Sequence, residues 1–160
     1  MGANEGEGEG GIFHQVGSMF SSLFGGRLST DQRLEVEVMF ALIGYLAKAD
    51  GLITSYESEF TNKMMDQLKL TLDGRAEALA AFDLGRQPGF DPAPEIARFI
   101  AVHPYGSEAS ERMFEVLLKL ALSDGRIYAR EREALEKVAA GFGISEQSLD
   151  LRLRALKESK

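Results

Sequence analysis

The feature that most restricts the fold is a helical pattern that stops at an Asp-Gly pair and occurs twice. The stretch LAKADGLITSYE ends an apolar helical run at Asp50 and begins another by Glu57. The stretch LALSDGRIYARE does the same at Asp124 and Glu131, 74 residues further along the chain. This arrangement favours a chain built from two copies of one helical hairpin.

A shift of 74 residues also matches positions on both sides of the turn. The matches are Met39-Phe40 with Met113-Phe114, Leu46-Ala47 with Leu120-Ala121, Ile53 with Ile127, Glu59 with Glu133, Lys63 with Lys137, and Leu70-Thr71 with Ile144-Ser145. Each copy contains a buried helix, an acidic turn, an amphipathic helix and a hydroxyl residue placed as the N-cap of the next helix. We expect the two hairpins to pack about a pseudo-twofold axis.

The periodicity predicts an all-α fold, a compact bundle of about seven helices built from two pseudo-symmetric helical hairpins. The predicted helices are at about 31–49, 55–69, 73–85, 92–102, 107–123, 129–142 and 146–158. The first and fifth are apolar on most sides and are expected to be central and buried. No segment alternates with period two, so no sheet is expected. Three prolines and a glycine at 86–94 predict a loop between the halves.

The first thirty residues form a separate region before the helical domain at 31–160. Residues 1–11 are acidic and glycine-rich, with almost nothing to bury, which predicts disorder. Residues 12–24 show a one-sided apolar stripe at helical spacing. Its candidate partner or membrane contacts are Ile12, Phe13, Val16, Phe20 and Phe24. The stripe can pack on the rest of the chain, on a partner protein or on a membrane surface, and the sequence leaves all three open.

Composition excludes several classes of function. The net charge is -7, which disfavours a nucleic-acid partner. The absence of cysteine excludes disulfides and thiolate metal sites. No apolar run approaches the roughly 18 residues of a transmembrane helix, and the acidic N-terminus does not fit a secretory signal. We therefore expect a cytoplasmic protein with, at most, a peripheral membrane contact through residues 12–24.

The acidic turns have a purely structural interpretation. Gly51 can supply the left-handed conformation that ends a helix. Thr54 and Glu57 have the spacing of a capping box at the start of the next helix. In the second copy Tyr128 stands in place of Thr54, so Glu131 lacks a hydroxyl partner there. This difference leaves room for a ligand role.

The alternative interpretation is a divalent-cation site. One Asp and one Glu per turn are too few oxygen ligands for a hard cation. If the pseudo-twofold axis brings both turns to one end of the bundle, Asp50, Glu57, Asp124 and Glu131 form a four-carboxylate site. Carboxylate ligands favour calcium or magnesium over zinc. The calcium-loop signature is absent, because Leu46 and Leu120 stand where its first ligand belongs.

Catalysis is not expected. His14 lies in the apolar stripe and His103 precedes a proline in a loop, and neither belongs to a triad or a histidine-rich metal motif. None of the serines lies in a nucleophile-elbow pattern.

The sequence resembles the TerB-like family, the all-helical domain of tellurite-resistance proteins. The resemblance rests on ALIGYLAKADGLITSYE, LLKLALSDGRIYARERE, AFDLGRQPGFD and VAAGFGISEQSLD, and it covers about residues 36–155. The most similar version is the N-terminal half of membrane-anchored J-domain co-chaperones of the DjlA type. The resemblance implies a compact helical bundle, no catalysis, and a divalent-cation or protein-docking role for the acidic turns. By position, those acids are Asp50, Glu57, Asp124 and Glu131.

Two departures from the DjlA type are visible. The sequence has no His-Pro-Asp tripeptide of a J domain, since His103-Pro104 is followed by Tyr105, and direct stimulation of an Hsp70 partner is not expected. Only the stripe at 12–24 stands where such proteins carry a membrane anchor. We therefore expect a non-catalytic, stress-related binding module with a protein partner. The alternative is a metal-independent interaction or oligomerisation domain, the TerB-like half of a DjlA-type co-chaperone lacking its J domain.

Overall fold

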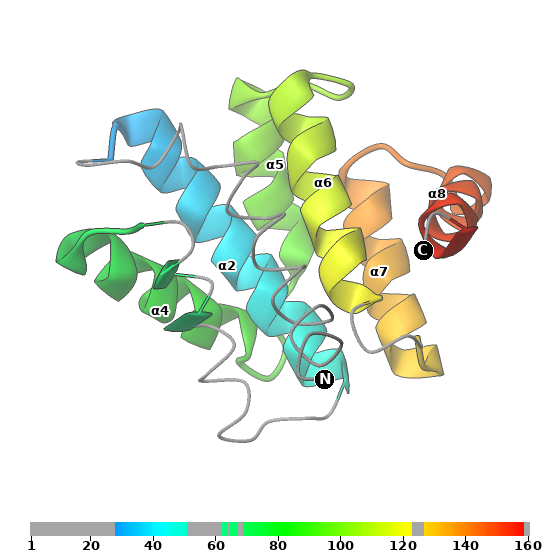
Figure 1. Cartoon of the computed structure of the whole chain (residues 1–160), viewed down its shortest axis with the longest axis horizontal. Helices are drawn as coiled ribbons and strands as arrows, with labels where there is room; N and C mark the ends of the chain where they lie inside the picture. Colours follow the sequence, from blue (N-terminus) through cyan, green and yellow to red (C-terminus); the bar gives the residue numbers. More distant parts are fainter. Residues whose placement is uncertain (1–27, 51–61, 64, 67–68, 123–126, 159–160) are drawn as a thin grey trace, which may run out of the picture.

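The secondary structure that the structure describes is entirely helical. The computed structural model describes residues 28–50, 62–63, 65–66, 69–122 and 127–158. Within these residues there are six helices and no strand, which confirms the all-α prediction (Figure 1). The helices are α2 (Thr30–Asp50), α4 (Leu72–Gly85), α5 (Pro92–Val102), α6 (Glu108–Ala121), α7 (Ala129–Gly141) and α8 (Glu146–Glu158).

The predicted helix at 55–69 lies mostly outside the described residues. Of that range, residues 62–63 and 65–66 are helical. The seventh helix and the pseudo-twofold axis therefore stay predictions. The predicted disorder of residues 1–11 and the stripe at 12–24 also fall outside the described part of the chain.

Helices α2 and α6 carry the centre of the core, as predicted from their apolar sides. Phe40 of α2 and Phe114 of α6 are fully buried, together with Phe99 of α5. α2 contacts α4, α5, α6 and α7, so it runs through the middle of the bundle (Figure 1). Burying a side chain of this size contributes about 1.5–3 kcal/mol, so these two helices hold the fold together.

The crossing of α2 and α4 depends on two glycines that let the helix backbones touch. A Cβ atom at Gly44 of α2 would overlap the carbonyl oxygen of Phe82, and one at Gly85 of α4 would overlap that of Ala41. Backbone atoms cannot move aside as a flexible side chain can. The two helices therefore approach more closely than any other residue at these two positions would permit.

The N-caps predicted after each hairpin are confirmed. Thr71 Oγ1 accepts a hydrogen bond of 3.2 Å from the Gly74 N–H at the start of α4. Ser145 Oγ accepts one of 3.1 Å from the Ser148 N–H at the start of α8. Both bonds engage a backbone donor that has no partner inside its helix.

The two copies of the repeat also share the backbone geometry that precedes these caps. Lys69 and Gly143, which are 74 residues apart, have positive φ angles of 57° and 72°. In each copy the N–H of the following residue donates to a carbonyl five residues back. These bonds are Leu70 to Met65, 3.2 Å, and Ile144 to Ala139, 2.8 Å. This is the Schellman arrangement, so the repeat is structural as well as sequential at this turn.

The loop between the halves is shorter than predicted. It was expected at 86–94, but α5 begins at Pro92, with the Asp91 carboxylate accepting from the Ala93 N–H at 3.0 Å as its N-cap. Proline fits the first turn of a helix because the backbone N–H that it lacks has no partner there. Pro92 and Pro94 therefore lie in the first turn of α5, whose bounds match the predicted helix at 92–102, and the loop between the halves ends at Asp91.

Candidate functional site

The acidic turns are only partly described by the structure. Asp50 is the last residue of α2, and Glu131 lies in the first turn of α7. Glu57 and Asp124 lie outside the described residues. The same holds for the predicted contact residues Ile12, Phe13, Val16, Phe20 and Phe24. Among the residues that are described, no three His, Asp or Glu side chains group so as to hold a metal ion, so the four-carboxylate site stays a prediction.

Glu131 has a local structural role. Its side chain is buried, and its Oε1 accepts a hydrogen bond of 3.2 Å from the Tyr128 backbone N–H at the start of α7. This bond is the half of a capping box that needs no hydroxyl group. The carboxylate also lies at the positive end of the helix dipole. Glu131 therefore has a role in the fold even though Tyr128 stands at the position that Thr54 has in the first copy.

The helix ends that carry Asp50 and Glu131 border one cavity of about 300 Å³, here called the α2–α7 cavity. Its walls come from the C-terminal end of α2, the loop between α4 and α5, and α7 from Arg130 to Lys137. The lining residues are Tyr45, Lys48, Ala49, Gln87, Gly89, Phe90, Arg130, Glu133, Ala134 and Lys137. Three cations, one carboxylate and two aromatic rings thus line the space between α2, α7 and the α4–α5 loop.

The aromatic wall of the α2–α7 cavity is formed by Tyr45 and Phe90. Their ring centroids are 5.9 Å apart, and the rings are tilted against each other. Burial raises the pKa of the Tyr45 hydroxyl, and the negative charges of Asp91 and Glu133 raise it further. At neutral pH the hydroxyl is therefore protonated and can donate a hydrogen bond.

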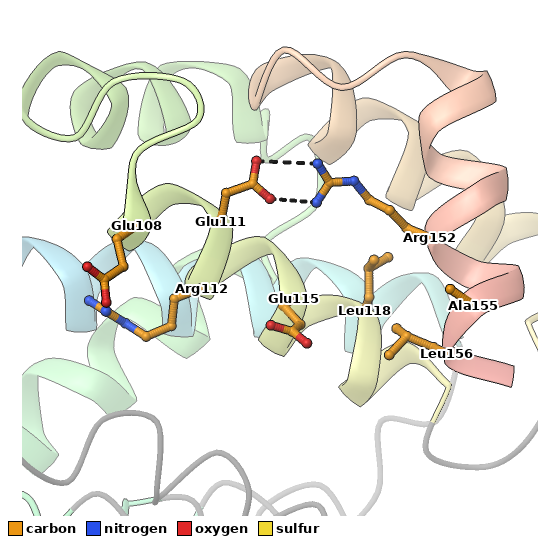
Figure 2. A pocket seen from close by; sticks show the side chains of 8 residues that line it. All are labelled: Glu108, Glu111, Arg112, Glu115, Leu118, Arg152, Ala155 and Leu156. Atoms are coloured by element: carbon orange, nitrogen blue, oxygen red, sulfur yellow. Dashed lines mark hydrogen bonds and ion pairs between the residues drawn. The ribbon is translucent and has the colours of Figure 1, made fainter. Parts of the chain in front are cut away.

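A larger cavity, of about 490 Å³, lies between α6 and α8 and is called the α6–α8 groove (Figure 2). The lining residues are Glu108, Glu111, Arg112, Glu115, Leu118, Arg152, Ala155 and Leu156. Figure 2 shows Leu118 from α6 opposite Ala155 and Leu156 from α8. The groove therefore has an apolar strip, with acidic residues of α6 beside it.

Both arginines of the groove are held by carboxylates from other parts of the chain. Arg152 donates two hydrogen bonds to Glu111, of 2.7 and 3.3 Å, across the gap between the helices (Figure 2). These bonds, with the charge of Arg152, lower the pKa of Glu111, although partial burial opposes the shift. Arg112 donates to Glu35 of α2 at 3.0 Å, and the Glu35 side chain is only 6% exposed. Glu115 is in turn paired with Lys119 at 3.5 Å. Among the described residues Glu108 is therefore the lining carboxylate without an ion pair, and the groove offers a partner a small negative charge.

Spacing along the chain did not reveal either cavity. Glu111 and Arg152 are 41 residues apart, and Glu35 and Arg112 are 77 apart. One local signal was present for the α2–α7 cavity. Arg130 stands in the first turn of α7, where the helix dipole disfavours a cation. A cation at such a position indicates an interaction with a group outside the helix.

The family described as "Tellurite resistance protein TerB" matches residues 29–153, which include all but the last turn of the described bundle. The chain belongs to the TerB family. Among its relatives, the Co-chaperone protein DjlA of Shewanella oneidensis is 35% identical over 134 residues, covering 84% of this chain and 51% of the relative. The Co-chaperone protein DjlA of Vibrio cholerae is 31% identical over 137 residues, covering 84% and 48%.

The TerB-family chain spans about half the length of these relatives. The same holds for the Co-chaperone protein DjlA of Aliivibrio fischeri, which is 33% identical over 139 residues, 86% of this chain and 49% of the relative. No solved structure matches the chain. Within the described residues, none of the helices combines the length and the apolar character needed to cross a membrane. The resemblance drawn from the two acidic-turn motifs is thus confirmed at the level of the family.

Proposed function

We propose that this TerB-family chain is a non-catalytic, stress-related binding and regulatory module of the co-chaperone type. The observation that carries the proposal is its similarity to proteins named as co-chaperones over 84% of its length. The environment of His103 supports a role without catalysis, because its ring packs on that of Phe99, with centroids 4.8 Å apart. Among the described residues its buried Nε2 has no hydrogen-bond partner, so it has neither a nucleophile nor an orienting carboxylate on that nitrogen.

The α6–α8 groove is the proposed docking surface, and its occupant is an amphipathic helix of a protein partner. Apolar side chains of that helix would contact Leu118 and Leu156, and basic side chains on its flank would face Glu108. Helices bind in this way where a groove combines an apolar strip with a charged rim. The volume of about 490 Å³ accommodates a few large side chains rather than a whole helix.

The docking proposal is tested with the variant Ala155→Arg. Ala155 is an exposed residue of the groove, so its substitution leaves the core intact. The probe is a fluorescent designed helix with one leucine face and one lysine face, and anisotropy reports its binding. The added arginine fills the groove and repels the lysines, and we expect affinity to fall about tenfold or more. Ala97→Arg, at an exposed position of α5, is the control with the same charge change. Equal binding by both variants would contradict the proposal.

A divalent cation at the acidic turns is proposed as the regulatory ligand, held by Asp50, Glu57, Asp124 and Glu131. Support comes from the α2–α7 cavity, because the helix ends that carry Asp50 and Glu131 both border it. A pseudo-twofold axis through this region would bring the other two acids to the same end of the bundle. Carboxylate oxygens suit calcium or magnesium. Such a cation would fix the two hairpins relative to each other and so adjust the docking surface.

Thermal unfolding of metal-stripped protein tests the cation site. At a hundred times the dissociation constant, calcium or magnesium is expected to add about 2.7 kcal/mol to the free energy of unfolding, a rise in Tm of about 5–10 °C. Asp50→Asn with Asp124→Asn is expected to abolish the rise. Asp31→Asn with Asp73→Asn, which changes two exposed acids elsewhere, is the control. A rise that persists in the first double variant would refute these ligands, and no rise with either cation would leave a metal-independent docking module.

A further inference from the structure

The three cations of the α2–α7 cavity differ from most others in the bundle. Lys48, Arg130 and Lys137 all line this cavity, yet none of them forms an ion pair with any residue that the structure describes. The neighbouring Arg132 of α7, by comparison, is paired with both Glu136 and Asp150. Cations that gather at a cavity without carboxylate partners are typical of a site for an anionic ligand.

Interactions within their own helices do not account for the positions of all three cations. Lys48 lies in the last turn of α2, where the helix dipole favours a positive charge. Arg130 lies in the first turn of α7, where the dipole opposes one. Glu133 and Lys137 have the spacing of a helix-surface ion pair, but the structure forms none between them. Nothing within α7 therefore explains why cations occupy positions 130 and 137, and an interaction with a group outside this helix is expected.

The charge and size of the cavity indicate the class of ligand. With Lys48, Arg130 and Lys137 positive and Glu133 negative, the lining side chains have a net charge of about +2. Asp91, outside the lining, adds one negative charge near Tyr45, so cations still outnumber carboxylates at this cavity. A phosphate monoester carries about -1.5 to -2 at neutral pH, which matches this charge. A volume of about 300 Å³ is at the lower end of the range for small-ligand pockets. The ligand is therefore a small group rather than a peptide segment.

We propose that the α2–α7 cavity binds a phosphate monoester, with Lys48, Arg130 and Lys137 around the phosphate. Arginine and lysine are the usual side chains for this purpose, because their charge-assisted hydrogen bonds reach several phosphate oxygens. The rings of Tyr45 and Phe90 form the wall on which the organic part of the ester lies. The proposal does not depend on cation binding at the acidic turns.

The experiment uses the full chain, with inorganic phosphate followed by two-dimensional NMR as the first probe. Sodium chloride at equal ionic strength controls for screening. The test variant is Arg130→Gln with Lys137→Gln. The matched control is Arg154→Gln with Lys157→Gln, which removes one arginine and one lysine at exposed positions of α8 outside the cavity.

A second probe is flotation with phosphatidylcholine vesicles, with and without phosphatidic acid, which presents the same phosphate group on a lipid.

The expected result is a saturable shift of the Lys48, Arg130 and Lys137 amides, weakened about tenfold in the test variant and unchanged in the control. Glu133→Gln is expected to strengthen binding, because it removes the carboxylate from the lining; a purely structural role for this residue would not do so. Response to free phosphate without flotation supports a soluble ester, and flotation that the test variant loses supports a lipid headgroup. No saturable response to either probe, or equal binding by the two double variants, overturns the proposal.

Discussion

At the scale of single residues, the two copies of the repeat place different residues at the same left-handed backbone position. Gly143 and Lys69 both occupy the left-handed position that ends a helix. Glycine adopts this conformation without a steric cost, whereas a residue with a Cβ atom pays about 1 kcal/mol. The first copy therefore keeps a strained residue where the second copy has the favoured one. Nothing that the structure shows of Lys69 explains why the chain retains it.

Lys69→Gly is expected to raise the free energy of unfolding by about 1 kcal/mol, because it relieves the positive φ of 57° at this position. Chemical denaturation measures the change. Lys69→Ala is the control, since it removes the same side chain but keeps the Cβ atom, and it should show no comparable gain. The reciprocal change, Gly143→Ala, should lower stability by about 1 kcal/mol or more. Loss of stability in Lys69→Gly would show that the lysine side chain itself holds the turn.

At the scale of elements, α8 is the helix with the smallest share of the core. Its buried side chains are Leu149 and Leu153. Leu156 also packs against the core, and two ion pairs add to the attachment, from Arg152 to Glu111 of α6 and from Asp150 to Arg132 of α7. Because α8 forms one wall of the α6–α8 groove, the position of this helix decides the width of the proposed docking surface (Figure 2).

The attachment of α8 is expected to weaken in acid. Arg152 holds the pKa of Glu111 below its ordinary value, so the pair stabilises the fold at pH values above that ordinary value, and the contribution is lost as pH falls through the lowered pKa. At neutral pH Glu111→Gln should therefore cost about 0.5 kcal/mol, a modest effect because the pair is partly exposed.

Hydrogen exchange of the α8 amides, measured across the acidic range, tests this expectation. The difference between wild type and Glu111→Gln should shrink as Glu111 becomes protonated. Glu158→Gln, at an exposed position in the last turn of α8, should show no such difference. A difference between wild type and Glu111→Gln that is independent of pH would exclude the charge of Glu111 as the cause.

At the scale of the whole molecule, α2 runs between the two proposed sites. Its first half binds α6 through Glu35 and Arg112, at the edge of the α6–α8 groove. Its last turns line the α2–α7 cavity. A ligand at the cavity and a partner at the groove would therefore contact the same central helix at different points along its length. This arrangement provides a physical route by which one site can influence the other.

The sequence by itself determined the helical class, most helix boundaries, the N-caps Thr71 and Ser145, the burial of α2 and α6, and the family. These properties depend on interactions within a few residues or on the side of a helix that is apolar, and both can be read from spacing. Even at this range the capping role of Glu131 was not predicted, because the prediction depended on the missing hydroxyl group, whereas a capping glutamate needs only a backbone donor. The tertiary structure alone decided that Glu111 meets Arg152 and that Arg130 joins Lys48 at one cavity. Such meetings depend on how helices pack, as the backbone contact of Gly44 with Phe82 shows, and no local pattern encodes that packing.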